Sequence, residues 1–228
     1  MQQTNVSAAA PLAMQHLIET HVSSELLFKG SFLHAKRDTV ALPDGSRATR
    51  EYVVHPGAVA IVPLLDNGHV VLERQFRYPV GLVMVEVPAG KLDAGEDPLL
   101  CGLRELREET GYSASEWAYA GKMHLAIAYS TEIIHVYFAR GLSLGAQELD
   151  QGEFLDVFTA PAEQLLDWCA DGTVTDAKTL VCSVFLSNHL SGRKPLAWQA
   201  MPRLAVPEAT DNAVAKAATQ AVAGVAVA

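Results

Sequence analysis

The sequence predicts a mixed α/β (α+β) fold for a chain of 228 residues. Three observations support this class. Short apolar runs separated by turn residues occupy the first 90 positions, as expected of strands. One strongly capped amphipathic helix follows, and two more helical segments lie beyond residue 160. The length suits one ordinary domain with an appendage, or two small domains.

The composition limits the class of partner. Lys and Arg number 17 and Asp and Glu 26, and the resulting net charge of −9 argues against a nucleic-acid surface. Three cysteines without a C-x-x-C pair argue against a disulfide scaffold or zinc finger. No apolar run is long enough to span a bilayer, and the first 14 residues lack the Lys or Arg of a signal peptide. We therefore expect a cytoplasmic protein with no nucleic-acid or membrane partner.

The N-terminal region predicts a small antiparallel sheet. Residues 1–22 show no periodicity and suggest a loosely ordered lead-in. Within residues 23–56, two strand-like segments at 32–42 and 47–55 flank a Pro-Asp-Gly-Ser turn. A hairpin of this size is unstable alone, so we expect it to pack on a larger surface.

A larger domain is predicted over residues 57–195. Apolar runs at 58–65 and 69–75 indicate a hairpin joined by an Asp-Asn-Gly turn. The clearest helix begins at Asp97-Pro98 and ends before Gly111, because Asp can cap it, Pro suits its first position and Gly suits its exit. The remaining predicted elements are strands at 83–87, 133–138 and 154–158, and helices at 162–170 and 176–189.

The C-terminal segment, residues 196–228, differs in composition. Ten of its last 25 residues are alanine, and it has almost no large apolar side chain there. Such a segment buries little surface, so we expect a weakly ordered tail.

Three glutamates of the predicted helix are candidates for chemistry. Glu105, Glu108 and Glu109 stand at i, i+3 and i+4, so their side chains leave one side of the helix and repel one another. A solvent-facing helix with Arg–Glu pairs would explain such a run. A divalent cation with oxygen ligands would neutralise it more completely, and the flanking glycines allow backbone carbonyls to approach it.

The segment 90–112 resembles the signature of the Nudix hydrolases, G-x5-E-x7-R-E-U-x-E-E-x-G-U. It matches at every fixed position of the signature. Of the two apolar positions written U, Leu106 occupies the first, and Tyr112 occupies the second, where a small aliphatic residue is more usual. From about residue 23 to 194, the chain resembles the ADP-ribose pyrophosphatase-like branch. That resemblance implies an α/β/α sandwich around a mixed sheet, preceded by a small antiparallel sheet that helps to form a homodimer.

The resemblance also implies a metal site that binds Mg²⁺, with Mn²⁺ as a possible substitute. Its ligands would be Glu105, Glu109, Glu108 and the carbonyl of Ala89. Among the expected catalytic residues, Glu108 supports the metal, Arg104 orients and neutralises the helix together with Glu96, and a loop carboxylate acts as general base. Glu153 is the first candidate for that base and Glu148 the second, while a solvated loop glutamate remains the alternative for Glu153.

Four residues would contact the substrate if the resemblance holds. Arg77 would meet the diphosphate, Arg50 would lie near the nucleobase, and Glu86 and Glu132 would meet sugar hydroxyls or metal. Each could equally be an ordinary surface or salt-bridge residue.

The implied activity is metal-dependent hydrolysis of the pyrophosphate bond of ADP-ribose or a related nucleoside diphosphate sugar. Ile127 stands where many ADP-ribose hydrolases have proline, which favours a GDP-mannose-like substrate as an alternative. A non-catalytic nucleotide-binding sensor is the alternative from another class, and the intact glutamates argue against it.

Overall fold

The computed structural model describes residues 12–201. They divide into two compact units, the first comprising residues 12–55 with 126–132 and the second residues 56–125 with 133–201. Within residues 12–201, no helix is both long enough and apolar enough to cross a membrane.

The first unit is a three-stranded antiparallel sheet in the order β1-β2-β3. The predicted hairpin is confirmed, and Asp44 stabilises its turn by accepting the N–H of Ser46 at 2.9 Å. An additional strand begins within the predicted lead-in, and its residues are all exposed, so no alternation marked it in the sequence. The elements are a 3-10 helix at Leu12–Leu17, β1 (Thr20–Lys29), β2 (His34–Ala41) and β3 (Arg47–Val54).

The second unit contains two sheets. A five-stranded mixed sheet has the order β11-β8-β9-β4-β7, in which β4 and β9 are parallel. A three-stranded antiparallel sheet has the order β10-β5-β6. Their strands are β4 (Ala58–Pro63), β5 (His69–Arg77), β6 (Leu82–Glu86), β7 (Ala89–Lys91), β8 (Tyr112–Met123), β9 (Ile134–Leu144), β10 (Leu155–Pro161) and β11 (Gln199–Ala200).

The predicted hairpin of β4 and β5 is wrong in its pairing. The turn exists, with Gly68 at a φ of 81°, but the two segments are joined by an isolated bridge between Leu64 and Val70 rather than by a ladder. Every residue of β4 is buried, since it lies between β9 and β7 in the middle of the larger sheet, whereas β5 pairs with β10 and β6. The run of apolar residues indicated burial but not the partner.

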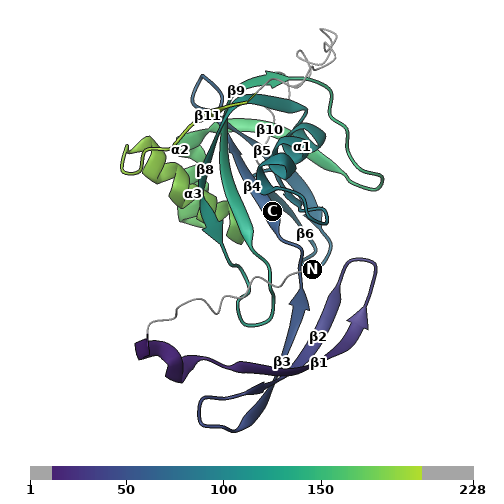
Figure 1. Cartoon of the computed structure of the whole chain (residues 1–228). Helices are drawn as coiled ribbons and strands as arrows, with labels where there is room; N and C mark the ends of the chain where they lie inside the picture. Colours follow the sequence, from purple (N-terminus) through teal and green to yellow (C-terminus); the bar gives the residue numbers. More distant parts are fainter. Residues whose placement is uncertain (1–11, 202–228) are drawn as a thin grey trace. The chain divides into compact units, whose positions relative to one another are not determined.

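The helices of the second unit lie on both faces of β4 (Figure 1). All three were predicted: α1 (Pro98–Thr110), α2 (Ala162–Asp171) and α3 (Ala177–Leu190). Because strand side chains alternate, Val59 and Ile61 pack with Leu106 of α1, while Ala60 belongs to the cluster that contains Leu186 of α3. This layering fixes α1 against the central sheet.

The predicted weak order of the tail stays a prediction, although its first residues contact the second unit. Residues 199–200 pair with β8, and Trp198 packs against the larger hydrophobic core. Leu196 packs against the same core, and Met201 packs against the second hydrophobic cluster. Residues 202–228 lie outside the described residues.

Candidate active site

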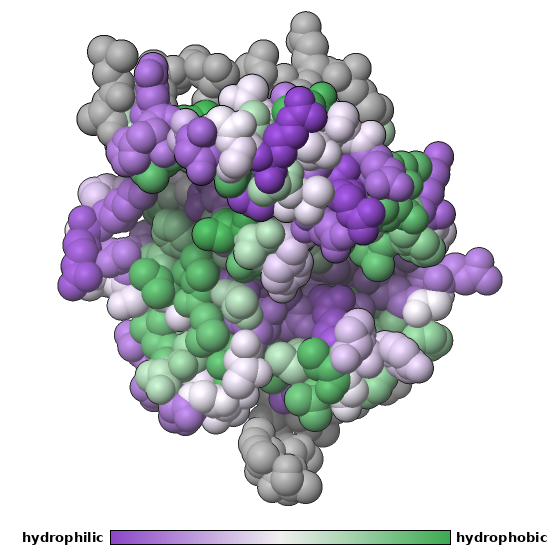
Figure 2. Space-filling view, turned by 90° about the horizontal axis from the view of Figure 1, so that it is seen from below, coloured by the Kyte–Doolittle hydropathy of each residue, from purple (hydrophilic) through white to green (hydrophobic). Residues whose placement is uncertain are grey.

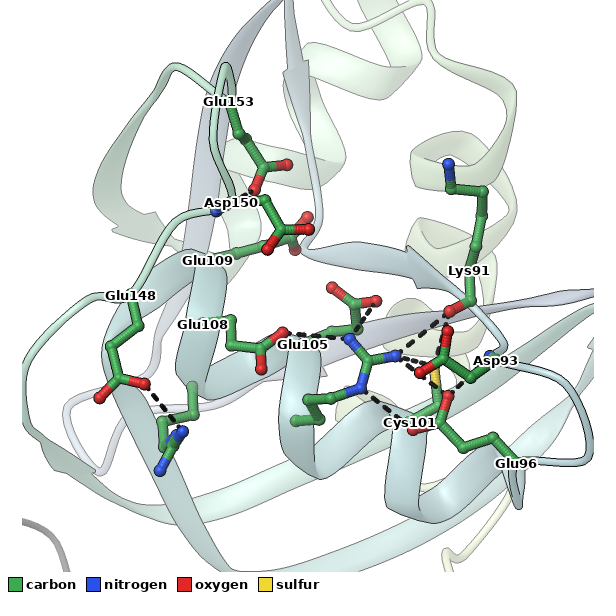
Figure 3. Close-up of polar contacts among 12 residues, drawn as sticks. Lys91, Asp93, Glu96, Cys101, Glu105, Glu108, Glu109, Glu148, Asp150 and Glu153 are labelled. Carbon is green, nitrogen blue, oxygen red and sulfur yellow. Dashed lines mark hydrogen bonds and ion pairs between the residues drawn. The ribbon is translucent and has the colours of Figure 1, made fainter. Parts of the chain in front are cut away.

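The acidic residues of the site belong to α1, whose ends follow from its sequence. Asp97 caps it by accepting two first-turn N–H groups at 2.9 and 3.3 Å, and Pro98 is its first residue. Gly111 ends it in the left-handed conformation, at a φ of 74°. Leu106 is fully buried and fixes the rotation of the helix. An adjacent side of the helix presents three carboxylates (Figure 3), those of Glu105, Glu108 and Glu109.

The backbone of β7 lies close to two of these carboxylates. A Cβ added to Gly90 would come within 1.8 Å of Cδ of Glu105, so only glycine leaves room for that side chain. The N–H of Ala89 donates to Oε2 of Glu109 at 3.0 Å. The structure therefore brings Ala89, Glu105 and Glu109 together, while a ligand role for the Ala89 carbonyl stays a prediction.

Arg104 neutralises part of the acidic charge. Its guanidinium donates to Glu105 at 2.8 Å, to Glu108 at 3.0 Å and to both oxygens of Glu96 at 3.0 Å. The hydrogen bonds from Arg104 lower the pKa of Glu96 to about 2. Arg104 thus links the loop before α1 to two of the helix glutamates, as an orienting residue would.

Three carboxyl groups of the site are incompletely compensated by positive charge, and one of them, Glu105, is itself a partner of Arg104. Burial raises the pKa of Glu109 well above its ordinary value, and the nearby charges of Glu73 and Glu105 raise it further. Burial also raises the pKa of Glu105, although Arg104 opposes this. Burial raises the pKa of Glu73 to about 8 despite the opposing charge of Lys178, and its buried Oε1 has no hydrogen-bond partner. Neighbouring cations therefore compensate the charged forms of these carboxyls incompletely.

Sequence reasoning gave Glu73 no role. A signal was present, because Glu73 directly continues the buried run of residues 70–72 in β5 and is itself only 4% exposed. Burying a charged residue within an apolar run costs free energy unless a partner compensates its charge.

The loop before β10 brings one predicted base to the acidic cluster. The charge of Glu153 acts on the carboxyls of Glu73, Glu105 and Glu109. Figure 3 shows its side chain pointing toward Glu109, and the N–H of Asp150 approaches its Oε2 at 3.4 Å. The structure therefore gathers Glu153 with the helix glutamates.

The second candidate base has a different environment. Glu148 pairs with Arg107 at 2.9 Å, and its side chain is 55% exposed. Figure 3 shows this ion pair at the side of α1. Glu148 is thus engaged at the surface rather than in the acidic cluster.

Two predicted substrate residues form an ion pair with each other. Arg77 donates from Nε and Nη2 to the two oxygens of Glu86, at 2.7 and 2.8 Å. Lys178 donates to Glu86 as well. Burial alone would raise the pKa of Glu86, but Arg77 and Lys178 outweigh it and the pKa is lowered. Both oxygens of Glu86 are therefore already engaged.

The other two predicted substrate residues belong to the first unit. Arg50 pairs with Glu19 through two guanidinium nitrogens. Glu132 lies 3.5 Å from Nε2 of His55. Their substrate roles stay predictions.

The donor set of the second unit fits a hard divalent cation. Glu105 and Glu109 supply carboxylate oxygens beside a glycine cradle, and the buried Oε1 of Glu73 lacks a partner. Over the part of the chain that the structure describes, no three His, Cys, Asp or Glu side chains are already arranged to hold an ion. Arg104 currently engages Glu105 and Glu108, so an ion would compete with it for these carboxylates.

Comparisons with known proteins give the family to which the chain is similar. The family described as NUDIX domain matches residues 54–180, and the nucleoside diphosphate sugar hydrolase N-terminal domain matches residues 19–53. ADP-ribose pyrophosphatase of Bacillus subtilis (strain 168) is 38% identical over 175 residues, which cover 76% of this chain and 95% of that protein. ADP-ribose pyrophosphatase of Mycobacterium tuberculosis (strain ATCC 25618 / H37Rv) is 46% identical over 129 residues, 56% of this chain and 62% of that protein.

A solved structure supports the fold. The crystal structure of an ADP compounds hydrolase superposes with a TM-score of 0.69 at 23% identity, covering 77% of this chain and 95% of that chain. The predicted mixed-sheet fold is thereby confirmed.

Proposed function

The chain is a Nudix hydrolase, and from this membership we propose that it splits the pyrophosphate bond of ADP-ribose or a related nucleoside diphosphate sugar. The products would be a nucleoside monophosphate and a sugar phosphate. The feature that supports this most directly is the pair of Glu109, which is buried, and Glu105, which is partly buried, both held against the β7 backbone and only partly neutralised by Arg104.

We assign the metal site to the acidic side of α1. Glu105 and Glu109 would be the main ligands of Mg²⁺ or Mn²⁺, with Glu108 and the Ala89 carbonyl as further donors. When bound, the ion supplies charge neutralisation at the diphosphate and lowers the pKa of a water molecule. Arg104 would hold Glu105 and Glu108 in place.

Glu153 is our candidate general base. It lies on a loop beside the acidic cluster, so its carboxylate could accept the proton of an attacking water. Glu148 is the weaker candidate, because Arg107 already engages it at the surface.

Arg77 is assigned to the diphosphate, since a planar guanidinium can donate to two phosphate oxygens. Its partner Glu86 would orient it rather than reach the sugar, because both Glu86 oxygens are occupied. We keep Arg50 and Glu132 as contacts for the nucleobase and the sugar.

We also propose a homodimer formed through the first unit. Leu26, Phe28, Phe32 and Leu33 are each about half exposed, which is costly for a three-stranded sheet. In the space-filling view, hydrophobic side chains gather into continuous areas (Figure 2). We expect sedimentation to give a dimer at micromolar concentration, and a compact monomer would contradict this.

One experiment tests the activity. ADP-ribose, GDP-mannose and other nucleotide sugars are incubated with the protein and Mg²⁺ or Mn²⁺, and phosphate monoesters are measured with and without EDTA. We expect metal-dependent turnover that is fastest with ADP-ribose. Faster turnover of GDP-mannose would favour the alternative substrate that Ile127 suggests, and tight binding without turnover would favour a sensor.

We expect the enzyme to act in the cytoplasm.

A further inference from the structure

A buried cation lies at the start of α3, outside the assigned metal site. Lys178 is 8% exposed, and its Nζ donates to Glu86 and, at 3.0 Å, to Asp176. Lysine is seldom buried unless it is paired. The N–H of Val87 also donates to Oγ1 of Thr179 at 3.0 Å, which ties the start of α3 to the residue after Glu86. The position of Lys178 relative to Glu86 is therefore fixed by two elements.

The charges of this network do not cancel evenly. Asp176 caps α3, accepting from the N–H of Thr179 at 2.9 Å and from its hydroxyl at 2.6 Å, so the helix terminus already stabilises its charge. Lys178 is consequently available to Glu86, which Arg77 also neutralises. Because Lys178 bridges Glu86 and Asp176, Arg77 shares the neutralisation of Glu86 with a second cation, and the Arg77 side chain is 44% exposed.

The geometry of Arg77 leaves donors for a ligand. A guanidinium has five N–H donors in one plane, and Glu86 takes one from Nε and one from Nη2. The Nη1 edge points away from that pair and suits the oxygens of a phosphate. If Lys178 were absent, Arg77 would alone neutralise Glu86 and would bind an anion less strongly.

We propose that Lys178 is a positioning residue, which acts through Glu86 to keep the Arg77 guanidinium oriented for the substrate diphosphate. This inference rests on the proposed function of the site. It gives a buried ion pair of α3 a role in recognition of the diphosphate group.

The direct test is Lys178→Met, which keeps the unbranched apolar part of the side chain and removes its charge. KM and kcat for ADP-ribose are measured with Mg²⁺, and the Kd of ADP-ribose is measured in EDTA, where hydrolysis stops. We expect KM and Kd to rise roughly tenfold, with a much smaller change in kcat, because the contact acts in binding. Unchanged KM and Kd would overturn the proposal.

A double mutant separates this role from ordinary stabilisation. In an Arg77→Gln background, Lys178→Met should add little to the rise in KM, since the residue through which it acts is gone. Full additivity would contradict the proposal. Lys194→Met is the control, because Lys194 donates to the carbonyl of Ala120 at 3.3 Å and lies outside this network, so its KM should match the wild type.

A spectroscopic measurement covers the case in which Lys178→Met does not fold or ADP-ribose is not a substrate. The side-chain Nε–H of Arg77 in the wild-type protein should be protected from hydrogen exchange by Glu86. Protection should fall in Lys178→Gln, which has no charge to fix Glu86, and should persist in Lys194→Met. Rapid exchange in the wild type, or equal protection in Lys178→Gln, overturns the positioning role. Absence of both turnover and binding by the wild type refutes the proposed function instead.

Discussion

Glu73 and Glu86 face each other across the β5–β6 pair and are about equally buried, yet their pKa values are shifted in opposite directions. Glu73 is 4% exposed and Glu86 is 2% exposed. Burial raises the pKa of Glu73 to about 8, whereas hydrogen bonds and charge from Arg77 and Lys178 lower the pKa of Glu86 despite its burial.

The difference shows that placement of cations decides what a buried carboxylate can do. Removing a carboxylate from water disfavours its charged form wherever this occurs. At Glu86 two cations compensate that cost with direct hydrogen bonds, so the group is a fixed part of the fold. Around Glu73, Glu105 and Glu109 the compensation is incomplete, which leaves charge available for an ion.

The largest expected effect comes from Glu109, one of the carboxyl groups whose charge is incompletely compensated. Glu109→Gln keeps the shape of the side chain and removes the charge that would bind the ion, so we expect activity to fall by about 10³-fold or more. Stability should be similar or slightly higher, because one member of a repelling cluster is lost. Steady-state turnover at saturating Mg²⁺ and a denaturant titration check both. Near-wild-type turnover would remove Glu109 from the ligand set.

The second prediction asks whether Glu153 shares in this chemistry. Glu153→Gln should lower kcat by roughly 10²–10⁴-fold, the usual contribution of a general base, and change substrate and metal binding much less. Glu148→Gln is the matched control on the same loop and should remain active, because Arg107 engages Glu148 at the surface. The reverse result would show that Glu148 is the base. Recovery of the Glu153→Gln rate with excess metal would instead indicate a metal ligand.

The same contrast explains how far the sequence could predict the site. The helix glutamates were predictable because α1 carries its own signals in Asp97, Pro98 and Gly111, and because their spacing puts them on one side. Lys178 and Glu73 gained no role from the sequence, since each acquires its partners from strands or helices far along the chain. Local patterns define an element, but the compensation of a buried charge depends on tertiary contacts.

The fold shows a similar division. Strand β4 was predicted from its apolar run, but its pairing was wrong, because burial on both faces does not identify the neighbouring strands. Strand β8 was not predicted, since residues 113–120 are rich in Ser and Ala, which have weak strand preference. Its pairing with β9 supplies what its own sequence lacks.

A third prediction concerns Glu86, whose charge Arg77 and Lys178 compensate. Glu86→Gln removes the charge that Arg77 and Lys178 share, and we expect it to lower the free energy of unfolding by about 2–4 kcal/mol, because Lys178 stays buried. The folded-state pKa of Glu86 is lowered, so its contribution is present above the ordinary carboxyl pKa and is lost as pH falls through the folded pKa. Urea titrations should therefore show the largest difference from wild type near pH 7 and a shrinking difference below about pH 4. Equal stability at pH 7 would mean that this network contributes nothing to the fold.

The smallest expected effect tests the comparison most sharply. Glu73→Gln should raise the free energy of unfolding, whereas Glu86→Gln should lower it. Glu73 has a folded pKa of about 8 against an ordinary value of 4.5, so between these values the folded state holds a proton that the unfolded state has released. Wild-type stability therefore falls as pH rises through this window, and Gln at position 73 removes that loss. In EDTA, Glu73→Gln should match the wild type near pH 4.5 and exceed it by on the order of 1–2 kcal/mol at pH 8–9, after allowance for relaxation around a buried charge. Urea titrations at three pH values measure this. A gain that is independent of pH would reflect packing, and a loss of stability at pH 8–9 would show that Glu73 is compensated as fully as Glu86.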